Sequence, residues 1–219
     1  MNLQLFEYLQ SYLTEHRKEL FKEVLEKRTQ HFTVVTEDVY QLHNTSAVMR
    51  SCDVFGIQDL HVIEERLGKR VDREIAMGAQ KWVNIHRYPS SQKCIQELRK
   101  EGYQIIATTP HNDSTLLHEF DVSQKSAFFF GTEKAGLSEA VMQEADGFLK
   151  IPMYGFTESL NISVSAAIIL QEVVTRMRLE NVSWQLSEAK KMELQFLWTK
   201  QSIKNVEKII ARVQNEKKS

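Results

Sequence analysis

The chain has 219 residues, of which 42% are hydrophobic and 26% are charged, and its formal net charge at pH 7 is -1. This composition is typical of one folded globular domain, with or without appended arms, and excludes a wholly disordered or collagen-like chain. The two cysteines, Cys52 and Cys94, are too few for a disulfide framework or a four-thiolate zinc site, so we expect a reducing compartment.

The N-terminal segment mixes acidic and basic residues and lacks the apolar stretch of a secretory signal peptide. The longest unbroken apolar runs, 127–130 and 166–170, are far shorter than the roughly 20 residues that a membrane-spanning helix needs. We therefore expect a cytoplasmic protein without a membrane anchor.

Charge is divided unevenly along the chain. Residues 1–31 carry a formal charge of 0, residues 32–175 carry -6, and residues 176–219 carry +5. A basic C-terminal segment on an acidic body suits contact with a polyanion, and a solvated helix face accounts for the same charges equally well.

The predicted elements alternate between strands and helices over 33–180, and helical arms flank this core. Apolar residues at three-, four- or seven-residue spacing predict helices over 1–30 and 187–215. The predicted strands are 33–36, 60–64, 81–88, 103–109, 126–131 and 147–153. The predicted helices between them are a helix ended by Gly56, then 90–102, 137–145 and 161–180, the last with a buried first half.

This alternation predicts an α/β fold with a mainly parallel sheet. We expect an N-terminal helical arm over 1–31, a central α/β domain over 32–178 and a C-terminal helical arm over 179–219. Each arm has an apolar stripe, which needs a partner surface on the core or on a second subunit.

Several familiar signatures are absent. The sequence contains no G-x-G-x-x-G, no G-x-x-x-x-G-K-[ST] and no G-x-S-x-G, so it supports neither a standard dinucleotide fold, a phosphate loop nor a hydrolase elbow. The seven histidines are scattered without H-E-x-x-H spacing, so we expect no metal site.

Three segments have compositions suited to a site. Residues 44–56 place an amide, Asn44, and a cation, Arg50, on successive turns of one helix, although a capped surface helix explains them as well. Residues 128–138 run from an apolar strand into a turn with two glycines, at the kind of strand end where ligands bind in α/β sheets; an ordinary tight connection is the alternative. Residues 151–165 place Ser and Asn at a helix start, where capping and packing are equally good explanations.

The order and combination of the three segments are specific. N-x-x-A-x-x-R-x-x-x-x-F-G, F-G-x-E-x-x-G-L-S and I-P-M-x-G…S-L-N-x-S-V-S resemble the three motifs of the SpoU branch of the SPOUT RNA methyltransferases. The resemblance covers about 37 to 175. Within that branch the chain is most similar to the TrmH type, the tRNA guanosine 2′-O-methyltransferases, because it has the pair 133–134, the stretch 78–82 and short helical arms.

The resemblance implies a fold, a donor and an assembly. The family's parallel sheet contains a deep trefoil knot, expected here around 126–175. Its members are homodimers with the active site near the subunit interface, and their methyl donor is S-adenosylmethionine. The positions that match the donor pocket are Thr108, Gly131, Ile151, Met153 and Leu160. The positions that match the polar set around the reacting ribose are Asn44, Arg50, Glu133, Ser159 and Asn161.

The resemblance assigns the central catalytic role to Arg50. The family proposal makes this arginine the base, but a guanidinium holds its proton tightly and is a poor base. We instead expect Arg50 to contact the ribose 2′-oxygen or an adjacent phosphate and to stabilise developing negative charge. Asn44 would orient Arg50 or the ribose, while Glu133 and Asn161 would fix their own loops.

Basic residues in two places are predicted to contact RNA phosphates. They are Arg66, Lys69, Arg70 and Arg73 in a central loop, and Lys190, Lys191, Lys200 and Lys204 in the C-terminal arm. The expected reaction is 2′-O-methylation of guanosine-18 in the D-loop of tRNA. The alternatives are the same chemistry on rRNA or another tRNA nucleotide, or a non-catalytic RNA-binding homodimer. An unrelated nucleotide-binding protein is disfavoured because no phosphate loop is present.

Overall fold

The computed structural model describes residues 3–39, 42–65, 78–110, 114–132 and 135–216. The chain divides into two compact units. The central unit is Thr29–Trp184, and the terminal unit combines Met1–Arg28 with Gln185–Ser219. No helix in the described ranges is long and apolar enough to cross a bilayer.

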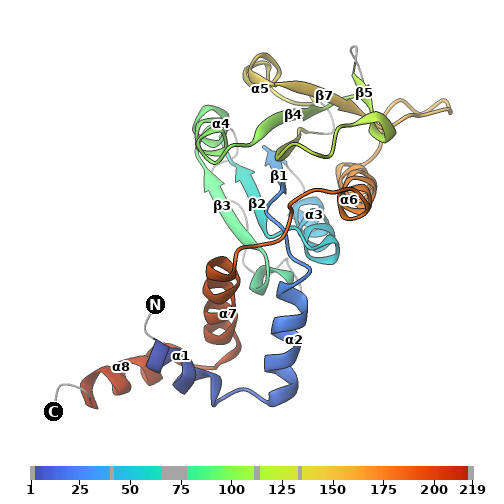
Figure 1. Cartoon of the computed structure of the whole chain (residues 1–219). Coiled ribbons are helices and arrows are strands. Elements are labelled where there is room, and N and C mark those ends of the chain that lie inside the picture. Colours follow the sequence, from blue (N-terminus) through green and yellow to red (C-terminus); the bar gives the residue numbers. More distant parts are fainter. Residues whose placement is uncertain (1–2, 40–41, 66–77, 111–113, 133–134, 217–219) are drawn as a thin grey trace. The chain divides into compact units, whose positions relative to one another are not determined.

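The central unit is built on a seven-stranded sheet in which every strand pair is parallel. Its strands are β1 (Phe32–Glu37), β2 (Asp59–Ile63), β3 (Asn84–Tyr88), β4 (Gln104–Thr108), β5 (Thr115–Leu116), β6 (Ser126–Phe130) and β7 (Gly147–Lys150). They are arranged in the order β3-β2-β1-β6-β4-β7-β5 (Figure 1). The predicted parallel α/β class is therefore confirmed. The two-residue β5 was not predicted, because so short a strand has no alternating pattern.

Helices cover both faces of this sheet, as an all-parallel sheet requires. They are α3 (Leu42–Phe55), α4 (Ser91–Lys100), α5 (Glu139–Glu144) and α6 (Ile162–Leu179), with short 3-10 helices at Ala79–Lys81 and Leu117–Glu119. Neighbouring residues of one strand enter opposite cores: Phe128 packs with residues of α3 and α6, while Phe129 packs with residues of α4 and α5. This alternation is the two-residue period of a strand.

Several details differ from the predictions for the central unit. The strand predicted over 147–153 ends at Lys150. The strand predicted over 81–88 begins only at Asn84, because a 3-10 helix occupies the residues before it. The first half of α6 was predicted to be buried, but Val164 and Ile168 are 45% and 37% exposed. This half of the helix therefore buries one face and leaves an apolar face open.

The terminal unit contains four helices rather than the two predicted. They are α1 (Leu3–Gln10), α2 (Glu15–Leu25), α7 (Glu188–Ser202) and α8 (Val206–Glu216). The single N-terminal helix was wrong because Thr14 adopts an extended conformation and its hydroxyl accepts a hydrogen bond from Arg17 N at 3.2 Å, which caps α2. The single C-terminal helix was wrong because the backbone at Asn205 has a φ of 54°, which α-helical residues do not adopt. Trp198 is buried in this unit and contacts Phe21 edge-on.

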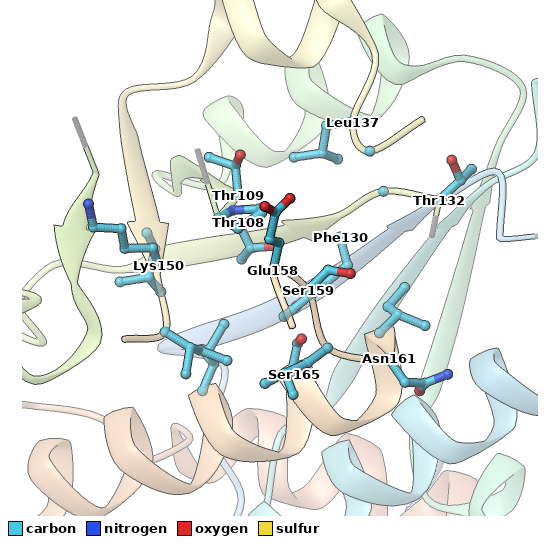
Figure 2. Close-up of a pocket in the computed structure, with 18 of the residues that line it drawn as sticks. Thr108, Thr109, Phe130, Thr132, Leu137, Lys150, Glu158, Ser159, Asn161 and Ser165 are labelled. Atoms are coloured by element: carbon cyan, nitrogen blue, oxygen red, sulfur yellow. The ribbon is translucent and has the colours of Figure 1, made fainter. Parts of the chain in front are cut away.

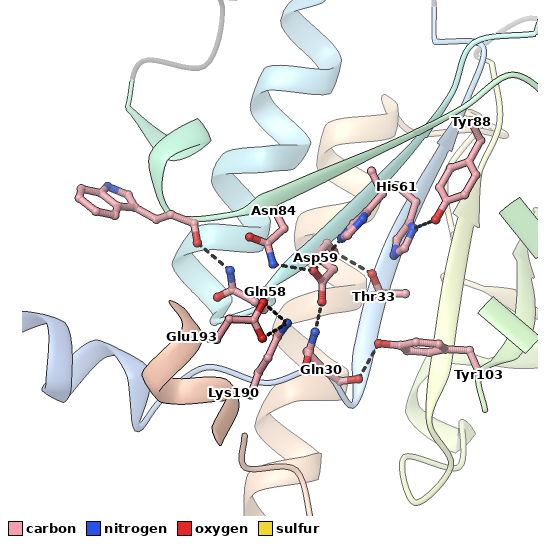
Figure 3. Close-up of polar contacts among 12 residues, drawn as sticks. Gln30, Thr33, Gln58, Asp59, His61, Asn84, Tyr88, Tyr103, Lys190 and Glu193 are labelled. Carbon is pink, nitrogen blue, oxygen red and sulfur yellow. Dashed lines mark hydrogen bonds and ion pairs between the residues drawn. The ribbon is translucent and has the colours of Figure 1, made fainter. Parts of the chain in front are cut away.

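A buried carboxylate fastens the amino ends of β1, β2 and β3 (Figure 3). Asp59 is 5% exposed and accepts hydrogen bonds from Gln30 Nε2 at 2.5 Å, Asn84 Nδ2 at 2.9 Å and His86 Nε2 at 2.9 Å. Burial raises the pKa of Asp59, but the hydrogen bonds from His86, Gln30 and Asn84 outweigh it and lower the pKa to about 2. The carboxylate therefore stays charged and holds the edge strand β3 in register.

His61 lies beside this carboxylate in the middle of β2. Its ring is stacked on that of His86, with 4.7 Å between centroids, and its Nδ1 is 3.1 Å from the hydroxyl of Tyr88. Burial and the charge of His86 lower the pKa of His61 to about 4, although Asp59 acts in the opposite direction. The imidazole is thus neutral in the folded protein at neutral pH.

The depressed pKa of His61 predicts an acid-dependent loss of stability. In the unfolded chain this histidine takes up a proton near pH 6.5, whereas the folded protein resists protonation down to about pH 4. The contribution of the neutral ring to the free energy of unfolding is therefore complete above pH 6.5. It falls by about 3 kcal/mol as the pH decreases from 6.5 to about 4. Urea titrations across the window should show a shallower decrease for His61→Gln. The matched control His118→Gln, whose ring is 58% exposed, should follow the unaltered protein.

Candidate active site

A cavity of about 760 Å³ opens where β4, β6 and β7 end. This volume lies within the roughly 300–1,000 Å³ of typical small-molecule sites. Figure 2 shows side chains from these strand ends and from the start of α6 arranged around it. Ligands of parallel α/β sheets bind at this carboxyl edge, because the loops that follow the strands converge there.

The connection from β6 to α5 forms one wall of the cavity. Thr132 and Gly136 make an antiparallel bridge, with Thr132 N 3.0 Å from Gly136 O and Gly136 N 2.9 Å from Thr132 O. This bridge brings Gly136 so close to Gly131 that a Cβ on Gly131 would lie 2.1 Å from the carbonyl carbon of Gly136. Only glycine fits at position 131, and the backbone itself therefore lines the cavity there.

The connection from β7 to α6 forms a second wall. It contains no regular structure from Ile151 to Leu160, and it ends at Asn161, the N-cap of α6. The Asn161 Oδ1 accepts hydrogen bonds from Ser163 N at 2.9 Å and from Ser163 Oγ at 2.6 Å. The predicted helix start at this position is confirmed.

One hydrogen bond joins the first and third sequence motifs. Asn161 Nδ2 donates to Asn44 Oδ1 at 3.3 Å, although the two residues are 117 positions apart. Asn44 is 3% exposed on α3, which packs against α6. The same helix presents Arg50 to solvent, six residues after Asn44. The amide pair therefore links α3, the helix that carries Arg50, to the start of α6 at the cavity, in addition to the apolar packing between the two helices.

The structure brings together most of the residues that the resemblance assigned to a site. All five predicted donor residues line the cavity: Thr108, Gly131, Ile151, Met153 and Leu160. Ser159 and Asn161 line it as well. Asn44 and Arg50 are not among its lining residues, but Asn44 accepts a hydrogen bond from Asn161, which is. Glu133 and the predicted basic loop residues Arg66, Lys69, Arg70 and Arg73 lie outside the described residues.

Two of the four C-terminal lysines predicted to contact RNA, Lys190 and Lys191, are paired with carboxylates in the terminal unit. Lys190 Nζ is 3.1 Å from Glu193, and Lys191 Nζ is 2.7 Å from Glu26 and 2.8 Å from Glu188. The Lys191 side chain is only 14% exposed. A phosphate that contacts either lysine must compete with these carboxylates. Further along the chain, Lys200 lies over the ring of Phe196 and Lys204 is exposed.

Several lining residues were missed by the sequence analysis. They include Thr109, Thr132, Leu137, Lys150, Glu158 and Ser165. Thr109 and Thr132 come within two residues of the strand ends at Thr108 and Phe130, so the carboxyl-edge rule would have found them. Leu137 and Ser165 lie inside the motif segments 128–138 and 151–165, but they are away from any strand end, and only the fold shows that their side chains reach the cavity.

The lining of the cavity is mainly uncharged. Lys150 and Glu158 are the charged members of the described lining, and the remainder are aliphatic, hydroxyl, amide or glycine residues, with one proline and one phenylalanine. Thr108 is fixed at the end of β4 because its hydroxyl donates to Phe129 O at 2.7 Å. Such a surface fits a ligand with a flat apolar part and hydroxyl groups, held largely by loop backbone.

Comparison with known proteins identifies the family. The family model described as the SpoU rRNA methylase family matches residues 31–171. The chain belongs to this family. A relative from Borreliella burgdorferi, named tRNA (guanosine(18)-2′-O)-methyltransferase, is 37% identical to this SpoU family member over 197 residues, which cover 90% of each chain.

Two solved structures of SpoU proteins have the same fold. The TrmH/SpoU tRNA modifying enzyme of A. aeolicus is 31% identical with a TM-score of 0.77, over 86% of this chain and 98% of that one. The SpoU methyltransferase AviRb of Streptomyces viridochromogenes, solved in complex with the cofactor AdoMet, is 25% identical with a TM-score of 0.63. That match covers 72% of this chain and 65% of the other.

The contact between Gly131 and Gly136 predicts very different costs for the same substitution at the two positions. Gly131→Ala should lower the free energy of unfolding by about 2–3 kcal/mol, because the methyl group meets backbone that cannot move aside. Gly136→Ala meets open space and should cost about 1 kcal/mol, which reflects only its φ of 68°. Urea denaturation of both variants tests this difference. Equal losses would contradict the proposed clash.

Proposed function

We propose that the protein transfers a methyl group from S-adenosylmethionine to a ribose 2′-hydroxyl of tRNA, at guanosine-18. The observation that carries this proposal is the convergence of the second and third motif segments on one cavity, where Gly131, Ile151 and Asn161 meet, with the first segment joined to it by the hydrogen bond between Asn161 and Asn44. The family match and the name of the Borreliella burgdorferi relative supply the reaction and the nucleotide.

The cavity fits this donor on its own evidence. Gly131 and Gly136, which pack against each other, both line the cavity, so part of its wall is backbone without side chains. Aliphatic side chains such as Ile151 and Leu160 suit the faces of adenine, and the hydroxyls of Thr108 and Ser159 suit the sugar. When bound, the donor supplies an electrophilic methyl group on a sulfonium.

The chain's own residues align the acceptor and stabilise its charge. Such alignment of reacting groups supplies roughly 7–11 kcal/mol of the barrier. Arg50 donates hydrogen bonds to the ribose 2′-oxygen or an adjacent phosphate and stabilises the negative charge that develops as the hydroxyl loses its proton. Asn44 and Asn161 hold α3 and α6 together so that Arg50 faces the acceptor. In this proposal Glu133 fixes the loop after β6.

The direct test is to incubate the protein with methyl-labelled S-adenosylmethionine and total RNA, and then to map the labelled nucleotide. The expected result is a 2′-O-methyl label on the D-loop guanosine of tRNA. Label in rRNA or at another tRNA nucleotide would support the proposed reaction but show that guanosine-18 of tRNA is not the substrate. If the protein binds S-adenosylmethionine but labels no RNA, the result would support the proposed cofactor and contradict the proposed transfer. If it does not bind S-adenosylmethionine, the result would favour a non-catalytic RNA-binding protein.

Arg50→Lys should lower turnover about 10²–10³-fold while leaving donor affinity unchanged. Lysine keeps the charge but loses the planar pair of donors that contacts two oxygens at once. The matched control is Arg87→Lys, since Arg87 pairs with Glu64 at 3.0 Å on the edge strand β3. Turnover near that of the unaltered protein in Arg50→Lys would remove Arg50 from the mechanism.

We further infer a homodimer assembled through an apolar strip before and along α6. The strip consists of Tyr154, Phe156, Leu160, Val164 and Ile168, which are 93%, 108%, 38%, 45% and 37% exposed. Large exposed apolar surfaces on soluble proteins usually mark interaction sites. Leu160 also lines the cavity, so an interface here would lie beside the active site.

The double substitution Val164→Asp with Ile168→Asp should convert the dimer to a monomer, because two buried charges in an apolar interface are costly. Met192→Asp is the control, since Met192 is 43% exposed on α7. Light scattering coupled to size-exclusion chromatography gives the mass of each variant. A monomeric unaltered protein would refute the dimer, and a dimer that persists in the double variant would refute this interface.

Three finer assignments accompany the proposal. The trefoil knot around 126–175 is supported by the order β6-β4-β7, in which an earlier strand lies between two later ones. Helical arms over 1–31 and 179–219 flank the catalytic domain at 32–178 and contact tRNA phosphates through Lys190, Lys191, Lys200 and Lys204. The protein acts in the cytoplasm, where tRNA is modified.

A further inference from the structure

Glu37 is a buried carboxylate at the carboxyl end of β1, and it lies outside the predicted site. It is 4% exposed. Its Oε2 accepts a hydrogen bond from Ser138 N at 2.8 Å, and its Oε1 accepts one from Ser138 Oγ at 2.7 Å. Ser91 Oγ also donates to Oε1. The three donors satisfy a charge that would otherwise be unfavourable in the interior.

Ser138 is the residue at which the cavity wall after β6 ends. Gly131, Thr132, Gly136 and Leu137 line the cavity, and Ser138 follows them directly. The Ser138 hydroxyl also accepts a hydrogen bond from Val141 N at 3.3 Å and so caps α5. It therefore donates to Glu37 and accepts from α5 at the same time, which fixes its rotamer.

The loop over 131–138 is thus fastened at two places. Near its start, the Thr132–Gly136 bridge packs Gly136 against Gly131. At its end, both the backbone and the side chain of Ser138 are attached to Glu37. Ser91 lies elsewhere, at the first turn of α4, and is not among the residues that line the cavity.

We propose that Glu37 is a positioning residue for donor binding, which acts through Ser138. Its carboxylate holds Ser138, and with it the adjoining cavity residues Gly136 and Leu137, where they enclose the methyl donor, and it contacts neither the donor nor the RNA. Replacement of the carboxylate by an amide would leave one acceptor oxygen for three donors, so the attachment of Ser138 would be weakened and the end of the loop loosened. Donor binding would then have to order this segment, which weakens affinity. The inference rests on the proposed function, because the ligand of the loop is the donor.

Glu37→Gln tests the proposal because it keeps the volume and removes the charge. Calorimetry with S-adenosylhomocysteine should show a dissociation constant about tenfold higher, with the KM for S-adenosylmethionine raised by a similar factor and kcat within about twofold. Ser91→Ala is the matched control. It removes a hydroxyl group that donates a hydrogen bond to Glu37, but it leaves both hydrogen bonds between Ser138 and Glu37 in place. Its dissociation constant should stay within about twofold of the original value.

Ser138 variants show whether the effect travels through this residue. Ser138→Ala should weaken binding as Glu37→Gln does, and the double variant should be no weaker than either single variant, because residues that act as one unit are not additive. Ser138→Thr keeps the hydroxyl and the N–H and should restore affinity. Should Glu37→Gln fail to fold, the comparison of Ser138→Ala with Ser91→Ala tests the same step.

Two results would overturn the proposal. One is a Glu37→Gln variant that binds S-adenosylhomocysteine like the unaltered protein, whatever its melting temperature. The other is a Ser91→Ala variant that loses as much affinity as Ser138→Ala, since that pattern indicates a general structural role. Failure of the unaltered protein to bind S-adenosylhomocysteine would instead overturn the proposed function, and this inference with it.

Discussion

The placement of β4 between β6 and β7 is the constraint on which the candidate site depends. Because all three strands are parallel, they end at one edge of the sheet, and the loops that follow them must leave side by side. These loops bring Thr108, Gly131 and Ile151 to a single cavity although they are far apart in the chain. The sheet order thus determines which residues meet, and the loop sequences determine what they bind.

Loops without regular structure need other interactions to hold one shape, and here the interactions are few and specific. The wall after β6 depends on the contact of Gly131 with Gly136 and on the hydrogen bonds of Ser138 to Glu37. The wall after β7 ends at Asn161, which is joined to Asn44. The contact between Gly131 and Gly136 holds one loop against itself, whereas Glu37 and Asn44 connect the two loops to β1 and α3. A cavity held in shape in this way costs less entropy when a ligand binds.

The sequence was sufficient for six of the seven strands, for the helix starts of the central unit and for five residues that line the cavity, because these follow from alternation, capping residues and ordered motifs. It was insufficient where a single local contact decides the outcome. Thr14 and Asn205 each break a helix that the apolar spacing continues. Glu37 stands at the end of a strand like any solvent-facing acid, and only the fold shows that Ser138, 101 residues later, reaches it.

The two units differ in charge in a way that matters for a polyanionic substrate. The terminal unit has 13 basic and 9 acidic residues, for +4, whereas the central unit has 15 basic and 20 acidic residues, for -5. Ion pairs such as Lys191 with Glu26 cancel charge over a few ångströms, but the net charge of a unit still acts over about a Debye length of 8–10 Å. A unit with this net charge attracts a polyanion without depending on any one lysine, and the attraction weakens with salt. Selection of one ribose, in contrast, depends on short contacts at the cavity, where the charge is nearly balanced and position decides.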